Sequence, residues 1–108
     1  MQNNGLLSAL SLCRKAGALT TGFDPVKDSV FTGKAVVVFI AQDLSPKTAQ
    51  RVRQYCEDFI DCLEIPLTMD ELSSITRKPA GVFAVTDGNL AKLCKGKLLV
   101  KKEEYNGN

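Results

Sequence analysis

The sequence predicts an α/β domain built as a three-layer α/β/α sandwich around a four-stranded mixed sheet. The main observation is the run from Ala35 to Ala41, seven apolar residues in a row, mostly β-branched. A run without polar alternation is typical of a strand buried on both faces, and burying both faces requires helices on both sides of the sheet. The second observation is that amphipathic segments with helix start and stop signals precede and follow this run.

Length and composition fit a single domain. The chain has 108 residues, of which 44% are apolar and 24% charged, and no apolar run approaches the roughly 20 residues of a membrane span. The first residues lack the positive region of a signal peptide, so we expect a cytosolic protein without a membrane partner. We expect one domain over residues 1–96 and a polar C-terminal tail over residues 97–108.

The first part of the chain predicts helix, strand and helix. Apolar residues at helical spacing are followed by Gly17, which suits the position after a helix end. The pair Asp24-Pro25 supplies an N-cap and a proline at the first helical position, and Gly33 terminates that segment. The expected elements are a helix over 5–16, a short strand over 18–21 and a helix over 24–32.

Beyond the central strand, the pair Ser45-Pro46 repeats the signal of a cap followed by proline. The segment starting at Thr68 matches a capping box. The apolar face of the third helix is expected to consist of Ala49, Val52, Cys56 and Phe59. The remaining expected elements are a strand near the sheet edge over 62–66, a short helix from 68 to about 75, a buried strand over 82–86 and a helix over 89–95 that Gly96 breaks.

The cysteines and the absence of histidine argue against a metal or redox centre. Cys13, Cys56, Cys62 and Cys94 form no CxxC pair, and the sequence has no histidine to complete a zinc site. Three of the four lie at apolar positions of helical patterns, where a free cysteine behaves as a small hydrophobic residue. We therefore expect buried reduced thiols, no metal and no cofactor. The missing histidine also removes the usual general base, which makes an enzyme less probable.

Charge is distributed unevenly along the chain. Residues 1–54 carry seven Lys/Arg against three acids, whereas residues 55–108 carry seven against nine. The stretch from Glu57 to Glu71 holds six acids and no base. Such a pattern is consistent either with ordinary solvated faces of opposite sign or with a basic side that meets an anionic partner.

The strand ends are the places where chemistry is expected. Strand-then-helix units predict that the loops after Thr21, Ala41 and Thr86 share one rim, where helix N-termini offer free N–H groups to an anion. The glycine patterns of nucleotide-binding loops are missing. Asp43 and Asp87 each follow a buried strand, which is typical of a phospho-acceptor site or, more simply, of helix capping.

Several segments, taken in order, resemble the bacterial YlxQ-type ribosomal-protein-like family. They are Leu12-Cys13-Arg14-Lys15-Ala16-Gly17, Thr21-Gly22-Phe23-Asp24, Gly33-Lys34-Ala35, Ala41-Gln42-Asp43-Leu44-Ser45-Pro46-Lys47-Thr48 and Val85-Thr86-Asp87. This family is part of the kink-turn RNA-binding superfamily of ribosomal proteins L-seven-Ae, L-thirty-e and S-twelve-e. The resemblance covers roughly residues 5–95 and implies an α/β/α sandwich of the L-thirty-e type.

The resemblance also implies where RNA would bind, namely the start of the second helix and the loop before the last strand. Gly22 matches the family glycine, whereas Asp24, Pro25 and Asp28 replace an asparagine, a glutamate and a lysine. In the loop over 72–79, Ser73 and either Thr76 or Arg77 stand in place of two glycines. Pro25 has no polar side chain for a G·A pair and Asp28 repels phosphate, so recognition differs from the family pattern.

We therefore predict a non-enzymatic, ribosome-associated protein that binds structured RNA, either rRNA or another kink-turn-like RNA. The turn leaving the first strand and the basic loop entering the last should lie side by side at one rim. The predicted RNA-binding residues are Arg14, Lys15, Gly22, Phe23, Asp24, Lys27, Lys34, Ser73, Arg77 and Lys78. Two alternatives stay open: a protein-interaction module that has lost RNA binding and uses the acidic stretch, and an enzyme with Asp43 or Asp87 as phospho-acceptor.

Overall fold

A computed structural model describes the backbone of residues 4–106 and the side chains of residues 5–98. Helices and strands alternate throughout these residues. In order, the elements are α1 (Asn4–Lys15), β1 (Leu19–Thr21), α2 (Phe23–Phe31), β2 (Val37–Ala41), α3 (Pro46–Cys56), β3 (Cys62–Ile65), α4 (Met69–Thr76), β4 (Val82–Val85) and α5 (Gly88–Asn106).

The four strands form one mixed sheet in the order β1-β4-β2-β3. β4 pairs antiparallel with both β1 and β2, whereas β2 and β3 run parallel. The interior positions belong to β2 and β4, and every residue of these two strands is buried. The sequence expectations of a central strand at β2 and an edge strand at β3 are therefore confirmed.

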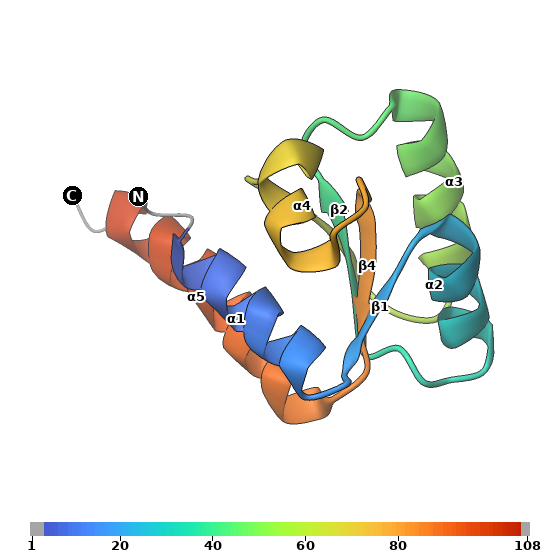
Figure 1. The fold of residues 1–108 in the computed structure, drawn as a ribbon, viewed down its shortest axis with the longest axis horizontal. Helices are drawn as coiled ribbons and strands as arrows, with labels where there is room; N and C mark the ends of the chain where they lie inside the picture. The colour runs from blue at the N-terminus through green and yellow to red at the C-terminus, as the bar shows by residue number, and fades with distance from the viewer. Residues whose placement is uncertain (1–3, 107–108) are drawn as a thin grey trace.

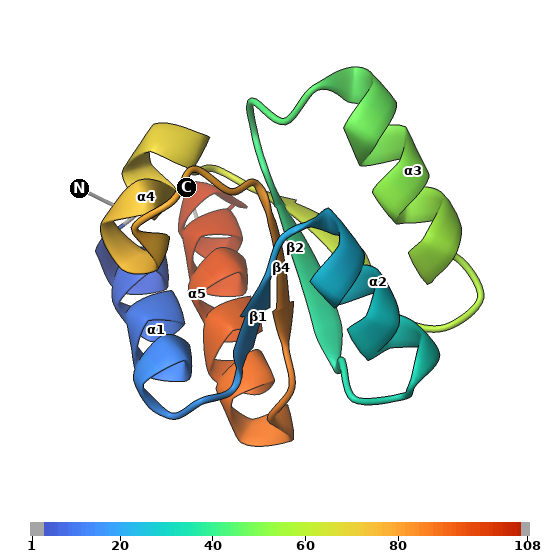
Figure 2. The same cartoon turned by 45° about the vertical axis from the view of Figure 1, so that its right-hand side comes forward.

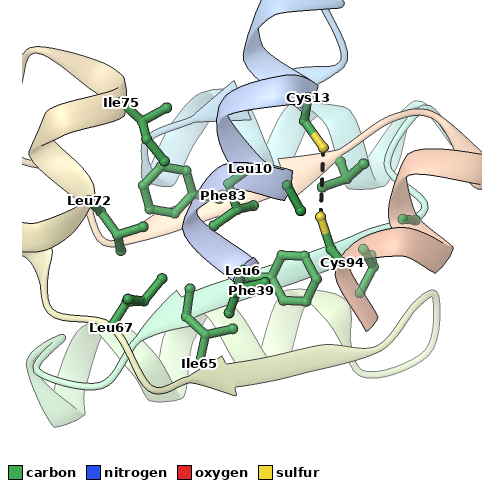
Figure 3. Packing of buried hydrophobic residues seen from close by; sticks show 14 of the residues in the cluster. Leu6, Leu10, Cys13, Phe39, Ile65, Leu67, Leu72, Ile75, Phe83 and Cys94 are labelled. Atoms are coloured by element: carbon green, nitrogen blue, oxygen red, sulfur yellow. Dashed lines mark hydrogen bonds between the residues drawn. The ribbon is translucent and has the colours of Figure 1, made fainter. Parts of the chain in front are cut away.

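Helices cover both faces of the sheet, as Figures 1 and 2 show. Helices α1, α4 and α5 lie on one face and α2 and α3 on the other. Each face has its own hydrophobic cluster, one centred on Phe39 and Phe83 and the other on Val38 and Ile40. The first cluster is drawn in Figure 3, where Leu6 and Leu10 of α1 point toward the two phenylalanines. The predicted three-layer α/β/α fold is confirmed.

Most helix boundaries follow from the start and stop signals in the sequence. Ser45 caps α3 by accepting from the N–H of Thr48, and Pro46 occupies the first turn. Thr68 and Glu71 form the complete capping box of α4. Gly17 follows α1 with φ of 72°, the left-handed conformation that a glycine adopts without a steric penalty.

The start of α2 and the end of α3 differ from the sequence prediction. Helix α2 begins at Phe23 with Gly22 as its N-cap, so Asp24 lies in the first turn and is not the cap. Helix α3 ends at Cys56, and the side chain of Phe59 is 59% exposed instead of completing the apolar face. The spacing that placed Phe59 inward holds only while the helix continues, and the chain turns after Cys56.

The last helix is longer than predicted, because α5 continues through Gly96 to Asn106. A glycine inside a helix costs only about 1 kcal/mol relative to alanine, which packing can offset. Leu98 packs against the core cluster, and an added Cβ at Gly5 of α1 would lie 3.4 Å from Lys97 Cδ. The helix break at Gly96 was therefore a wrong prediction. The division into a domain over 1–96 and a tail over 97–108 stays a prediction.

Candidate nucleic-acid interface

Three segments that are distant in sequence meet at one rim of the sheet, which we call the Gly22 rim. The backbone N–H of Gly22, in the turn leaving β1, donates to the carbonyl of Val82 at 2.9 Å. The N–H of Ala41, at the end of β2, donates to the carbonyl of Gly81 at 2.9 Å. The turns leaving β1 and β2 therefore flank the segment over 77–81, which enters β4. The predicted neighbourhood of turn and basic loop is present.

Gly22 has φ of 102° and ψ of 153°, a combination that is essentially restricted to glycine. This conformation lets the chain leave β1 and enter α2 within one residue. Gly22 gives no side-chain cap to α2, and Pro25 has no N–H. The N–H groups of Phe23 and Asp24 therefore remain available at the helix start, where the helix dipole favours an anion.

Phe23 fixes the start of α2 against α3. Its ring packs edge-on against Tyr55 with a centroid distance of 5.3 Å, and its carbonyl accepts from the Tyr55 hydroxyl at 3.1 Å. Burial, together with the neighbouring Cys56, raises the pKa of the Tyr55 hydroxyl. The hydroxyl therefore stays protonated and keeps donating, so the position of Phe23 at the rim is determined by packing and by a hydrogen bond.

The basic loop begins with Arg77, the C-cap of α4, in the left-handed conformation with φ of 68°. Its N–H donates to the carbonyl of Ser73 at 3.1 Å, and its side chain is exposed, as is that of Lys78. The loop then passes Gly81, where an added Cβ would lie 2.8 Å from Leu44 Cδ1. The segment over 77–81 is therefore packed tightly at Gly81 and has two exposed cations, Arg77 and Lys78, at its other end.

Carboxylates also lie at this rim, including those of Asp70 and Glu71 in the first turn of α4. Asp43 Oδ1 accepts from the N–H of Met69 at 2.9 Å, so it caps α4. The side chain of Asp24 is exposed in the first turn of α2. An RNA phosphate at the helix start would therefore approach one free carboxylate, which must turn aside or contact a base.

Of two further lysines, Lys47 adds to the positive charge near this rim, whereas the ammonium of Lys27 lies beside Phe31, the last residue of α2. Lys27 follows the first turn of α2, with its ammonium 5.9 Å from the centre of the Phe31 ring. Lys47 lies exposed in the first turn of α3, directly after the turn that leaves β2. Lys47 was missing from the predicted RNA-binding residues. The sequence signal for Lys47 is its position directly after Ser45-Pro46. A helix cap that follows a central strand places the first turn of the next helix, and therefore Lys47, at the end of that strand.

Three of the predicted cations lie at the opposite rim. Arg14 and Lys15 end α1, and Lys34 follows α2, so all three precede strands that run toward the Gly22 rim. Strands of three and five residues, as β1 and β2 are, span roughly 10 and 17 Å. This length separates the three cations from the Gly22 rim. The loop after Thr86 also lies there, contrary to the prediction, because β4 runs antiparallel to β1 and β2.

An open hollow with a volume of about 850 Å³ runs along α2 from the opposite rim to Pro25 in the first turn of that helix. Its lining includes Gly17, Lys34 and Thr86, and also Ser29, whose hydroxyl is buried without a hydrogen-bond partner among the described residues. Ser73, another predicted site residue, lies within α4 and donates its hydroxyl to the carbonyl of Asp70 at 2.6 Å. Its side chain is therefore engaged inside its own helix and is not directed at a ligand.

The two aspartates that suggested a phospho-acceptor site do not form a cluster. Asp43 follows β2 at the Gly22 rim, whereas Asp87 follows β4 at the opposite rim and caps α5 by accepting from the N–H of Leu90 at 2.9 Å. Within residues 5–98, no group of three or more cysteine, aspartate or glutamate side chains could hold a metal ion. No described helix is both long and apolar enough to cross a membrane.

The fold and the rim together define an α/β/α scaffold in which a glycine turn and a basic loop meet beside two helix starts. The resemblance to the YlxQ-type family is confirmed by a relative, the RNA-binding protein YlxQ of Enterococcus faecium. It is 29% identical over 90 residues, which cover 82% of this chain and 86% of that protein. No family model matches the chain.

Two solved structures share the fold. One is a protein of unknown function from Bacillus halodurans, with a TM-score of 0.78 and 22% identity, covering 85% of this chain and 94% of that one. The other is the 15.5 kD RNA-binding protein of Giardia lamblia, with a TM-score of 0.73 and 21% identity, covering 89% of this chain and 83% of that one. At these identities the likeness establishes the fold alone.

Proposed function

We propose that this chain is a bacterial, cytoplasmic protein that binds structured RNA through the Gly22 rim and catalyses no reaction. The observation that carries the proposal is the hydrogen bond from Gly22 to Val82, the first residue of β4. It puts the turn at Gly22 beside the end of the segment over 77–81, which contains Arg77 and Lys78. The relative named as an RNA-binding protein supports it. Phosphates would meet these two cations and Lys27, while the free N–H groups of α2 would bind one further phosphate oxygen.

The proposed target is rRNA or another kink-turn-like RNA, with association to the ribosome. The family resemblance supports this finer proposal, and the exposed Asp24 and Asp28 define how recognition would change. A carboxylate accepts from the amino groups of bases but repels phosphate, so these positions would favour base edges over backbone. Shape recognition would then rest on the backbone at Gly22 and on the cations of the loop.

The test is a gel shift with structured RNA at low and moderate salt, using Lys27→Glu and Lys78→Glu. Each variant should weaken binding and reduce the log-log salt slope by roughly 0.7 to 0.9 per lost phosphate contact. Lys92→Glu is the matched control, because Lys92 is exposed on α5, on the other side of the sheet. If RNA fails to bind even at low salt, or all three variants behave alike, the proposal is wrong.

A second arm of the same assay tests the kink-turn. Pro25→Glu combined with Asp28→Lys restores the residue types that the family uses at these positions. Affinity for a kink-turn RNA should rise relative to an RNA whose tandem G·A pairs are replaced by Watson–Crick pairs. An equal rise for both RNAs would show that only charge, and no kink-turn recognition, was gained.

A further inference from the structure

An aromatic patch lies at the C-terminal ends of α2 and α3, apart from the loops of the Gly22 rim. It consists of Phe31 and Phe59, whose rings meet edge-on at 5.5 Å, with Tyr55 contacting Phe31 at 6.2 Å. Phe31 is 51% and Phe59 59% exposed, whereas Tyr55 is only 8% exposed. Two neighbouring phenylalanine rings that are held in place but more than half exposed leave apolar area in water, which is unfavourable for an isolated chain.

Acidic side chains border one side of this patch. The turn over 57–61, which contains Phe59, carries three acids and no base. Asp61 pairs with Lys95 at 3.4 Å, but none of the ion pairs found among residues 5–98 includes Glu57 or Asp58. Both follow the C-terminus of α3, where the helix dipole disfavours negative charge. The isolated chain therefore has unpaired acids in an unfavourable position beside an exposed ring.

One ring of the patch already contacts a cation of the same chain. The ammonium of Lys27 lies 5.9 Å from the centre of the Phe31 ring, within cation–π range. Phe59 has no such cation among the described residues, although Glu57 and Asp58 precede it directly. A lysine or arginine from outside the chain would meet an aromatic ring and two free carboxylates there, and an adjacent apolar side chain would cover the exposed rings.

We propose that Phe31 and Phe59, with the acidic turn over 57–61, form a docking surface for a protein segment that carries lysine or arginine beside apolar side chains. Charge complementarity selects this partner over RNA, whose phosphates would be repelled by Glu57 and Asp58. The surface would be used together with the Gly22 rim, so one molecule would join a basic protein segment to RNA. The proposal goes beyond RNA binding and does not depend on it.

The test is an NMR titration of the full ¹⁵N-labelled chain with a short amidated peptide of alternating leucine and lysine pairs. A second peptide has glutamate in place of lysine. The lysine peptide should shift the amide signals of Phe31 and of residues 57–61, with an affinity that falls as salt is raised. The glutamate peptide should leave those signals unchanged. Equal binding of both peptides, or shifts elsewhere only, would overturn the proposal.

Variants separate docking from folding. Phe31→Ala with Phe59→Ala should weaken binding of the lysine peptide about tenfold, and Glu57→Lys with Asp58→Lys should do the same. All four side chains are exposed, so circular dichroism should remain that of the parent chain. Leu12→Ala is the matched control, because Leu12 is 47% exposed on α1, beyond the other face of the sheet, and should change the affinity less than twofold.

Two other occupants would overturn the proposal by different signals. A second copy of the chain would appear as a doubled mass in sedimentation that the phenylalanine double variant abolishes. RNA bases on this surface would shift the signals of Glu57, Asp58 and Phe59 on addition of structured RNA. Phe31 is left out of this readout, because Lys27, a proposed phosphate contact, lies beside its ring. If RNA does not use this surface, Glu57→Lys with Asp58→Lys should not weaken RNA binding in the gel shift. The added positive charge should raise the RNA affinity only slightly. Loss of RNA binding with retained peptide binding would refute only the proposed function.

Discussion

Arg77 has a backbone conformation that costs stability and a side chain that the proposed function needs. Its φ of 68° is in the left-handed region. At a helix end, glycine is the usual residue with this backbone conformation. Such a conformation costs roughly 1–2 kcal/mol for a residue with a Cβ. A position that keeps arginine in spite of this cost is expected to use the guanidinium group, here for phosphate at the Gly22 rim.

We predict that Arg77→Gly stabilises the chain by about 1 kcal/mol while it weakens binding of structured RNA. Urea unfolding measures the first effect and the gel shift the second. Arg77→Lys is the control, because it keeps both the charge and the backbone strain and should leave stability nearly unchanged. A glycine variant that is stabilised and binds RNA as well as the parent would remove Arg77 from the proposed interface.

At the scale of the element, α4 shows how a short helix positions the loop that follows it. Two N–H groups in its first turn have side-chain acceptors. The N–H of Glu71 donates to Thr68 within the capping box, and the N–H of Met69 donates to Asp43, which lies in the turn after β2. Asp43 therefore joins α4 to the end of the central strand. Because α4 has only eight residues, this link also determines where Arg77 begins the basic loop.

We predict that Asp43→Ala lowers the free energy of unfolding by about 1 kcal/mol, the typical loss for a side chain that caps a helix N-terminus. Asp70→Ala is a matched control, since Asp70 lies in the first turn of α4 but its carboxylate makes no hydrogen bond among the described contacts. Both variants remove one negative charge near the same helix start. If both variants lose the same free energy of unfolding in urea, the removed charge explains the loss and the hydrogen bond of Asp43 does not.

Element boundaries could be predicted where a local signal settles them. Ser45-Pro46 and the capping box at Thr68 determined two helix starts, because side-chain caps act within a few residues. The length of α5 could not be predicted, since Gly96 is a local stop signal that packing of Leu98 overrides. Phe59 was misplaced for the opposite reason, because the apolar spacing continues past the point where the helix ends.

At the scale of the whole molecule, the layers followed from the sequence but the distribution of the site residues did not. Two buried strands and amphipathic helices suffice to predict an α/β/α sandwich. The apolar pattern of β4 does not show whether the strand runs parallel or antiparallel to its neighbours. The loop after Thr86 was therefore expected at the wrong rim. Arg14, Lys15 and Lys34 could have been separated from Gly22, because each lies at or just after the end of a helix that precedes a strand.

The same global packing creates a dependence on alkaline pH. Cys13 of α1 and Cys94 of α5 are fully buried, with their sulfur atoms 3.7 Å apart (Figure 3). Burial raises the pKa of the Cys13 thiol, and burial together with Cys13 raises the pKa of Cys94 to about 12. Unfolding exposes both thiols, whose pKa returns to about 8.5. The unfolded chain therefore binds fewer protons than the folded one above that pH.

Stability should consequently be unaffected by these thiols below about pH 8 and fall as the pH rises, by about 1.4 kcal/mol per pH unit for each thiol. Urea unfolding between pH 7 and 10 in the presence of a reductant measures this slope. Cys13→Ala with Cys94→Ala should start less stable, because it leaves a cavity, but should lose less stability on the way to pH 10. Val85→Ala, a truncation in the same cluster without a thiol, should keep the parent slope. If the double cysteine variant also keeps the parent slope, the thiols are ionised equally in the folded and unfolded states. The close packing of α1 against α5 then has no part in the loss of stability at alkaline pH.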